Sequence, residues 1–405
     1  MGILTISTKE EYHLSIFIGT GSVNALLYAL QKGKKPRILE VFLRPHSIIP
    51  TPYFGTLQAY VKRELEELTK GAAATLKGKH IRGVHVLLAS PWYFSQTRIV
   101  TIKKDIPFVA DKKTLKESLD KETETFLADA GERFSGEKGE YRIVEMSFMR
   151  ILMNGYEVNE FLNKHARELT LDMYISLSLR KFIEGVDHVI TSHFSPREIL
   201  FYTAPFVFFK TIKQFWSHDA GQNIFDVDEG VVVVDIGGEV TDVTIIRKGI
   251  IEETFTFGKG MHFIVRRIAS AFSLSPKDAF SLFRAWEKDE VAASKKTSIE
   301  SLVVSAIQEW RALFEKVLRE ASDHILLPAN IIVAGEGAYL SGFSKALQGP
   351  SFQEFVLQHQ SFRVTVLEPK LIRHYFDGEA RVFAYNAEAA PLYLLSIPIE
   401  STQLS

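Results

Sequence analysis

The sequence predicts an α/β protein made of two similar lobes and a small inserted domain. Patterns typical of strands alternate with patterns typical of helices along most of the chain, as in α/β folds. Residues 90–168 interrupt that alternation with a different pattern of strands and helix, typical of a small α+β domain. A unit of strand, Ile-Gly turn and strand also occurs twice, once from Leu14 and once from Val232. A repeated unit of this kind indicates a duplicated architecture.

Composition sets the broad class of the protein. With 405 residues, of which 46% are hydrophobic, the chain is long enough to form two domains. A formal net charge of -1 gives no electrostatic reason to expect nucleic acid as a partner. The chain has no cysteine, which excludes disulfides, thiolate metal sites and cysteine nucleophiles and agrees with a reducing cytoplasm.

The sequence also bears on membrane contact. It does not open with a basic region followed by an apolar stretch, so we expect no secretory signal. The most apolar stretch, residues 199–209, is far shorter than the roughly 20 residues of a membrane span. We therefore expect any membrane contact to be peripheral or made through a partner.

The first lobe is expected to begin with strands and a helix. Residues 13–18 and 23–30 have the pattern of two strands joined by a glycine-containing turn, and residues 37–43 that of a third. Apolar residues at three and four spacing predict a helix over 57–76. A further strand is expected at 84–89.

The interrupting segment is expected to form a small α+β domain. Strand patterns at 93–102 and 141–152 flank a charged amphipathic helix pattern at 111–129. Residues 168–179 alternate apolar and polar side chains, which predicts a half-exposed antiparallel strand. We expect 90–168 to be the insert, with this last strand leading back into the first lobe.

The α/β pattern returns in the second lobe. The continuous apolar run at 231–236 predicts a fully buried strand. Further strands are expected at 240–247 and 250–257, helices at 259–273, 276–288 and 298–324, and an exposed loop at 288–298.

The two copies of the hairpin match position by position. The alignment places Ile16 on Val234, Phe17 on Asp235, Ile18 on Ile236, Gly19 on Gly237, Asn24 on Asp242 and Leu27 on Ile245. A glycine-rich turn lets backbone N–H groups approach an anion because no Cβ intervenes. Two such turns that face each other would hold the phosphates of a nucleotide, and an acid such as Asp235 would hold a hydrated Mg²⁺ or orient a water.

A third element completes this pattern. Residues 331–334 form a buried strand pattern, and residues 335–343 follow as a glycine-rich turn that opens a helix. The glycines there would let the chain pass close to a flat ligand such as a base and ribose.

As a set, these three segments resemble the motifs of the actin-like ATPase superfamily, whose duplicated lobes are ribonuclease H-like. Residues 14–28 resemble its first phosphate motif, 232–246 its second phosphate motif and 331–343 its adenosine motif. The resemblance extends to the FtsA and PilM family of cell division and type IV pilus assembly. In that family an SHS2-like domain, also called 1C, is inserted into the first lobe, and residues 150–180 resemble its exit.

The resemblance implies a division of the chain and a ligand. The first actin-like lobe would comprise 1–89 and 169–215, the insert 90–168, the second lobe 216–398 and a tail 399–405. ATP or ADP with Mg²⁺ would bind between the lobes, with Asp235 orienting the metal through water and the attacking water. The residues implied in nucleotide contact are Gly19, Thr20, Gly21, Ser22, Asn24, Gly237, Gly238, Thr241, Gly258, Gly260, Gly335, Glu336, Gly337 and Tyr339.

Several positions depart from the family pattern. Phe17 stands where the family has an acid, Asn24 where it often has lysine, and Ala204-Pro205 where it has Glu-Pro. Gly258-Lys259-Gly260 stands where the family has Gly-Gly-Asn, and Glu336 stands where it has a glycine. Phe280 and Phe283 lie near the positions at which the family has a Glu and a Lys that contact adenine. In contrast, Asp235, Gly237, Gly238, Thr241 and Asp242 fit the second phosphate motif. We therefore expect hydrolysis to suffer more than binding, which leaves at most a weak ATPase.

The resemblance implies a cytoplasmic scaffold at the inner face of the membrane that recruits protein partners of the divisome or the pilus machine. Self-association is implied by the resemblance alone. Two alternatives stay open: a pseudo-ATPase adaptor that binds only proteins, and a small-molecule kinase of the same superfamily.

The end of the sequence bears on which branch of the family it resembles. FtsA proteins typically finish with an amphipathic membrane helix, whereas the helix-like stretch 379–396 runs into IPIESTQLS without a basic amphipathic tail. This favours either PilM-like docking, in which a partner's peptide binds a groove beside the insert, or a divergent FtsA with another anchor.

Overall fold

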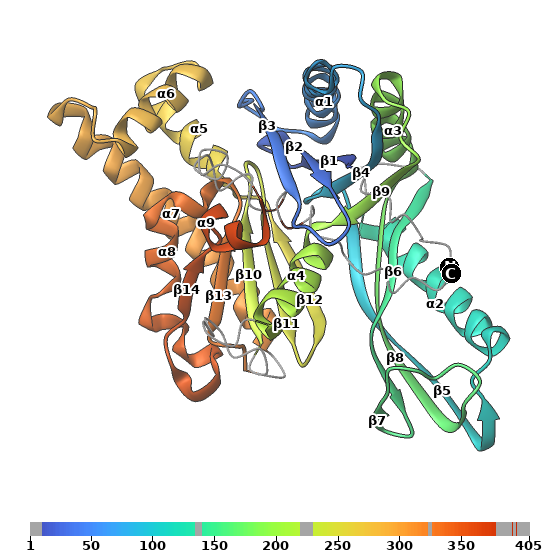
Figure 1. The fold of residues 1–405 in the computed structure, drawn as a ribbon. Helices are drawn as coiled ribbons and strands as arrows, with labels where there is room; N and C mark the ends of the chain where they lie inside the picture. The colour runs from blue at the N-terminus through green and yellow to red at the C-terminus, as the bar shows by residue number, and fades with distance from the viewer. Residues whose placement is uncertain are drawn as a thin grey trace.

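The structure is a computed structural model that describes residues 10–133, 140–218, 230–322 and 326–377, together with Pro391 and Leu394. Within these ranges, the side chains of 132, 133, 213–218 and 370 are not described. The helix predicted at 379–396 lies outside the described residues apart from Pro391 and Leu394, and the tail predicted at 399–405 lies wholly outside them. The described part is a mixed α/β fold with three sheets, as the sequence predicts (Figure 1).

The first lobe contains a five-stranded sheet in the order β3-β2-β1-β4-β9. Its strands are β1 (Glu11–Ile18), β2 (Ser22–Leu30), β3 (Arg37–Pro45), β4 (Ile81–Leu88) and β9 (Glu198–Thr203). β1 pairs antiparallel with β2 and parallel with β4. Successive side chains of β1 point to opposite faces. One face packs against α1 (Phe54–Leu76) and α3 (Arg180–His193), and the other against α4 (Ala204–His218).

The second lobe repeats this topology in the order β12-β11-β10-β13-β14. Its strands are β10 (Val231–Ile236), β11 (Thr241–Arg247), β12 (Ile250–Phe257), β13 (Asn330–Ala334) and β14 (Arg363–Val366). The register of the two hairpins is also the same, since Phe17 pairs with Asn24 in one and Asp235 with Asp242 in the other. The internal repeat predicted from the sequence is thereby confirmed.

The helices of the second lobe are α5 (Met261–Phe272), α6 (Pro276–Glu287), α7 (Ala293–Ser322), α8 (Ser341–Leu347) and α9 (Pro369–Ile372). Short 3₁₀ turns lie at Glu336–Tyr339, Pro350–Phe355, Leu357–His359 and Arg373–Tyr375. The exposed loop predicted at 288–298 is wrong in its second half, where α7 already begins at Ala293. Residues 293–298 contain neither glycine nor proline, so nothing in this segment stops the helix from starting early.

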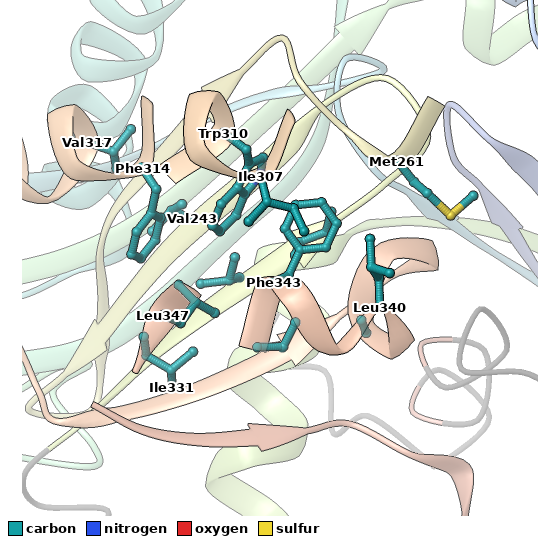
Figure 2. Close-up of a cluster of buried hydrophobic side chains, with 14 of the residues drawn as sticks. Val243, Met261, Ile307, Trp310, Phe314, Val317, Ile331, Leu340, Phe343 and Leu347 are labelled. Carbon is teal, nitrogen blue, oxygen red and sulfur yellow. The ribbon is translucent and has the colours of Figure 1, made fainter. Parts of the chain in front are cut away.

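A large aromatic cluster fills the core of the second lobe (Figure 2). Trp310 of α7 stacks on Phe314 with ring centroids 5.3 Å apart and meets the edge of Phe343 at 4.9 Å. Its indole N–H donates a hydrogen bond to Thr241 Oγ1 at 2.9 Å. This bond anchors the start of β11, next to the turn between β10 and β11.

The two lobes share a core around α4, which lies between their sheets (Figure 1). Phe17 of β1 belongs to this core, together with α4 side chains such as Phe206 and with Val233 of β10. The phenylalanine that replaces the expected acid is therefore a buried part of the contact between the lobes.

The inserted domain is a four-stranded sheet in the order β5-β8-β6-β7 with α2 on one face (Figure 1). Its elements are β5 (Phe94–Val109), α2 (Lys112–Arg133), β6 (Tyr141–Met153), β7 (Tyr156–Glu157) and β8 (His165–Leu179). β8 pairs well past residue 168, as far as Leu177 with β5 and Leu179 with β6. We propose that the insert extends over this strand. The bounds of the lobes themselves stay a prediction.

The prediction that residues 168–179 form a half-exposed strand is wrong for the C-terminal half of β8, where both faces are buried. Its hydroxyl side chains face buried polar groups of β6, of β9 and of the segment after β4 instead of solvent. The hydroxyl of Tyr174 lies 2.7 Å from Thr203 Oγ1, Ser176 donates to Glu145 at 2.9 Å, and Ser178 donates to the carbonyl of Trp92 at 2.5 Å. These hydrogen bonds satisfy the buried hydroxyls, which is why polar residues are tolerated there.

Candidate functional site

The candidate site lies where the two glycine turns of the repeat meet. In one turn the N–H of Gly19 donates to Ser22 at 3.0 Å, and in the other the N–H of Gly237 donates to Val240 at 2.9 Å. The turns touch each other directly, because a Cβ built on Gly238 would lie only 2.5 Å from the Cα of Gly21. Glycine is needed at position 238 for this approach.

A hydrogen bond joins the same two turns. The backbone N–H of Glu239 in the second lobe donates to Thr20 Oγ1 in the first lobe at 2.9 Å. Thr20 is buried, so the bond is shielded from water. The turns that were predicted to face a nucleotide from opposite sides are thus bonded to each other.

A small cavity lies beside this contact. Its volume is about 20 Å³, which is about the space of one water molecule. It is lined by Phe17, Gly19, Thr20, Ala89, Ser90, Asp235, Gly237, Val240, Asp242, Gly335 and Glu336. The lining includes three carboxylates, and no lysine or arginine among the described residues contributes to it.

Two of these carboxylates, Asp235 and Asp242, face each other across the β10–β11 hairpin. Asp242 accepts hydrogen bonds from Thr256 Oγ1 at 2.5 Å, and from the Tyr93 hydroxyl and the Ser90 N–H at 3.4 Å each. Burial raises the pKa of Asp242, and these bonds oppose that rise. Asp242 therefore ties the segment after β4 to the second lobe.

Asp235 is different, because no hydrogen bond to its carboxylate occurs within the described residues. Its side chain is buried and lines the cavity. Burial, with a further contribution from the neighbouring charge of Asp242, raises the pKa of Asp235 to about 7. Asp235 is the one predicted catalytic residue, and the structure places it where it could hold a water.

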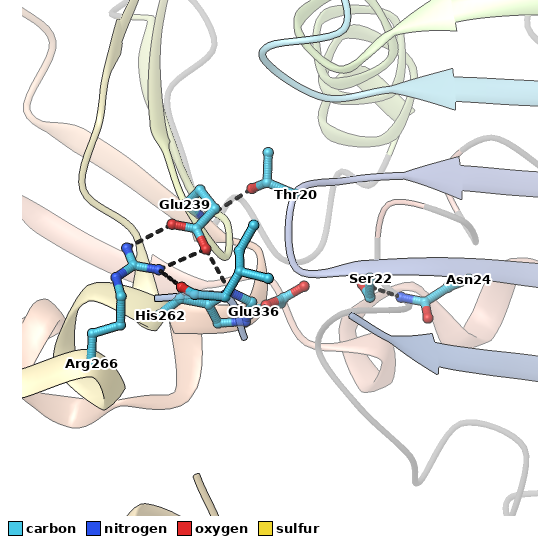
Figure 3. A network of polar contacts seen from close by, with 8 residues as sticks. Thr20, Ser22, Asn24, Glu239, His262, Arg266 and Glu336 are labelled. Carbon is cyan, nitrogen blue, oxygen red and sulfur yellow. Dashed lines mark hydrogen bonds and ion pairs between the residues drawn. The ribbon is translucent and has the colours of Figure 1, made fainter. Parts of the chain in front are cut away.

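A charged network adjoins the turns (Figure 3). The carboxylate of Glu239 accepts hydrogen bonds from His262 Nδ1 at 3.0 Å and from both terminal nitrogens of Arg266 at 2.9 and 2.7 Å. Arg266 also donates to the carbonyl of Ile49 in the first lobe at 3.4 Å. Burial alone would raise the pKa of Glu239, but the bonds from His262 and Arg266 outweigh it and hold the pKa below its usual value.

Glu336 completes the site from the adenosine-motif side. Its side chain is only 7% exposed and lies against Gly21, where its carboxylate occupies the space that a Cβ on Gly21 would need. The Nε2 atom of His262 is 3.8 Å from Glu336 Oε2. His262 thus lies between the carboxylates of Glu239 and Glu336.

The remaining predicted contact residues are not directed at the cavity. Asn24 donates to Ser22 at 3.0 Å and accepts from the N–H of Arg44 at 3.2 Å, so both polar ends of its side chain bond within the first lobe. Thr241 donates to the carbonyl of Lys259 at 2.7 Å and accepts from Trp310. The other positions are either packed or exposed: Gly337 against Ile236 and Phe343, Gly260 against the carbonyls of Gly237 and Gly238, Phe280 and Phe283 in the core of the second lobe, and Gly258 and Tyr339 at the surface.

Sequence reasoning missed Glu239, His262 and Arg266. These residues come from a turn and from α5, and no local pattern shows that they meet. One signal was present: His262 and Arg266 are four residues apart, so they share a face of the helix. That spacing alone did not identify their acidic partner.

The residues at this site do not fit a nucleoside triphosphate in the arrangement described. The glycine turns touch, so no phosphate can lie between them, and the carboxylates that line the cavity would repel one. The N–H groups of Met261 and His262 at the start of α5 donate to the carbonyls of Gly237 and Gly238 at 2.9 and 2.8 Å. Helix N-termini are common anion sites, but these two donors are already occupied.

The described ranges contain no group of three or more His, Cys, Asp or Glu side chains arranged to hold a metal ion. No helix in the described part of the chain is both long enough and apolar enough for a membrane span.

No protein-family model matches the sequence, and no curated protein matches it significantly. Solved structures do match. One matching chain belongs to a PilM-PilN type IV pilus biogenesis complex. Its sequence is 15% identical to this one, the match covers 95% of this chain and 96% of that chain, and the TM-score is 0.59. Ethanolamine utilization protein EutJ from Carboxydothermus hydrogenoformans is 13% identical over 94% and 90% of the two chains, with a TM-score of 0.45. MreB 5 of Spiroplasma citri, bound to AMPPNP, is 13% identical over 88% and 91%, with a TM-score of 0.41.

At such identities, similarity shows the fold alone. The likeness to PilM runs over nearly the whole length of both chains, and the five-stranded sheets of the two lobes repeat one topology. The chain therefore has the duplicated, two-lobed fold of the actin-like ATPases and is similar in structure to PilM.

Proposed function

We propose that this chain is an actin-like adaptor of a membrane-linked machine, in which contacts between the lobes take the place of a nucleotide. The observation that carries the proposal is the direct contact of the two glycine turns beside a cavity of about 20 Å³. A protein held closed in this way offers a constant surface to its partners. The adaptor would act in the cytoplasm at the inner face of the membrane.

A groove beside the insert supports binding of a partner's peptide. It has a volume of about 180 Å³ and lies between β6, α3 and β9. Its lining residues are Arg142, Ile143, Val144, Ile183, Ile199, Leu200, Phe201 and Tyr202. The mixture of apolar side chains and one cationic side chain suits an extended apolar segment that carries an acidic residue.

The backbone around the groove also suits an extended segment. β9 is the edge strand of the first sheet, so it pairs with β4 on one side, and no described strand pairs with its other side. At its C-terminal end the Thr203 N–H already donates to Glu145 of β6, so an added strand would bind the residues before Thr203. Edge strands present backbone N–H and C=O groups that can bind an added strand. The side chain of Arg142 lies over the ring of Phe201 at 5.6 Å and forms no ion pair within the described residues. Its charge is therefore available to an acidic side chain of the partner.

The likeness to a PilM-PilN complex supports this choice of partner class, because that complex is a pilus biogenesis assembly of two proteins. We propose a partner of the same general kind here, namely a protein of the membrane machine that offers a short extended peptide. Such an adaptor would suit either process, pilus assembly or cell division.

A selection from a library of random short peptides tests the groove. We expect the selected peptides to carry alternating apolar residues and an acid, and to bind about tenfold more weakly or worse after Ile199→Asp, since a charge in the groove opposes an apolar peptide. Arg142→Ala should weaken binding less. Fluorescence polarisation with labelled peptides measures both effects.

The matched control is Val304→Asp on α7, which changes a residue that is 49% exposed and lies in the other lobe. Peptide affinity should stay the same in this variant. Selected peptides that bind the wild type and the Ile199→Asp variant equally would show that this groove is not the docking site.

A second candidate is a nucleotide-regulated scaffold, which the position of Asp235 favours. Its carboxylate faces the cavity without a hydrogen-bond partner in the described residues, as an acid that receives hydrated Mg²⁺ would. In this alternative the lobes separate and ATP or ADP enters between the turns. The two candidates differ in whether the distance between the lobes depends on nucleotide.

A further inference from the structure

Glu336 is positioned by the backbone before it. Gly335 has a φ of 85° and lies so close to Asp235 and the carbonyl of Ile236 that no Cβ fits there. A residue with this φ and no room for a side chain must be glycine. The chain therefore leaves β13 in one fixed direction, and the next side chain, that of Glu336, points toward the turn between β1 and β2.

The carboxylate of Glu336 lies against that turn at Gly21. It lies in the space that a Cβ on Gly21 would occupy, and its side chain is 7% exposed. Turns of this kind are anion sites because their backbone N–H groups converge. An anion that belongs to the protein itself already lies against this one.

A nearby base accompanies the carboxylate. His262 uses Nδ1 to bond Glu239, which leaves Nε2 on the side of Glu336, at 3.8 Å from its Oε2. Burial of an ionised carboxylate is costly unless donors or opposite charge surround it. His262 lies within reach of this carboxylate, and without the Glu336 side chain the space beside Gly21 would be open to an external phosphate.

We propose that Glu336 acts as an internal ligand of the turn between β1 and β2, and that it excludes polyphosphates from the cleft by occupying their place with a negative charge. The inference deepens the proposed function and rests on it in one respect, since it takes the wild-type cleft to be closed to nucleotide. It does not depend on the peptide groove. Glu336 is thus a specificity residue: its removal should free the space beside Gly21 for a phosphate group, outside the contact of Gly21 with Gly238.

The test is calorimetric titration of the wild type and the Glu336→Gly variant with ATP, each with and without Mg²⁺, and with inorganic pyrophosphate. We expect the glycine variant to bind Mg²⁺-ATP at least tenfold more tightly than the wild type. Glu336→Gln keeps the size of the side chain and removes its charge, so it should show a smaller gain. Glu354→Ala, which removes an exposed carboxylate that pairs with Arg319, should behave as the wild type.

The outcomes separate this inference from the proposed function. If neither the wild type nor either Glu336 variant binds, the inference is wrong and the proposed adaptor stands. If the wild type binds ATP as tightly as the glycine variant, both are wrong. Should Glu336→Gly fail to fold, the glutamine variant decides alone, and binding no tighter than in the wild type would overturn the inference.

Discussion

Replacing Glu239 by alanine is expected to lower the free energy of unfolding by about 3 kcal/mol, since the removal of one partner from a buried ion pair leaves the other charge uncompensated. The side chain of Glu239 is 6% exposed, and those of His262 and Arg266 are 5% and 21% exposed. Without Glu239, Arg266 also loses the group that holds it near the carbonyl of Ile49. The variant should therefore weaken both the second lobe and its contact with the first lobe.

Two readouts check this expectation: urea unfolding, and hydrogen exchange in the turn between β1 and β2, which should become faster. Glu309→Ala is the matched control, because Glu309 also pairs with an α5 arginine, Arg267, but its side chain is 43% exposed. An exposed pair contributes about 1 kcal/mol or less. Equal losses in the two variants, or unchanged exchange in the turn, would contradict the role given to Glu239.

Stability is expected to fall by roughly 4 kcal/mol between pH 5 and pH 8 because of one carboxyl group, that of Glu145 in β6. This group joins the insert to the first lobe. It accepts hydrogen bonds from Ser176 at 2.9 Å, from Thr203 Oγ1 at 2.5 Å and from the Thr203 N–H at 3.2 Å. Burial raises the pKa of Glu145 from 4.5 to about 8, although these bonds lower it.

The sign follows from proton binding. Between pH 4.5 and pH 8 the folded protein keeps a proton on Glu145 that the unfolded chain releases, so folding is favoured at low pH and this contribution is lost as pH rises through 8. Glu145→Gln is neutral at every pH and removes the effect. Urea unfolding at several pH values should give a gap between variant and wild type that widens with pH. Parallel curves would show that Glu145 does not titrate in this way.

Local periodicity predicted most of the elements, because the side-chain pattern of a strand or helix depends on neighbours in sequence. The strand at 231–236 and the register of the two hairpins are examples. The prediction that the polar face of β8 is exposed was wrong for a related reason. Alternating hydroxyls look the same whether they face water or, like Ser176, a buried acid, and only the fold decides which.

The site was predicted less completely than the fold. The glycines of both turns were identified from their repeat, but the contact of Gly21 with Gly238 and the bond from Glu239 to Thr20 join segments far apart in sequence. From the sequence, Phe17 in place of an acid indicated only that hydrolysis would be impaired. Its place in the core between the lobes became evident only from the packing of α4.

The central claim is that protein contacts hold the two lobes together in the absence of nucleotide, and a distance measurement between the lobes tests it most directly. The chain has no cysteine, so spin labels can be attached at Lys62→Cys on α1 and Gln308→Cys on α7, both exposed positions. We expect electron paramagnetic resonance to give a single narrow distance distribution that Mg²⁺-ATP leaves unchanged. A broad distribution that narrows or shifts when Mg²⁺-ATP is added would contradict the account and support a nucleotide-regulated scaffold.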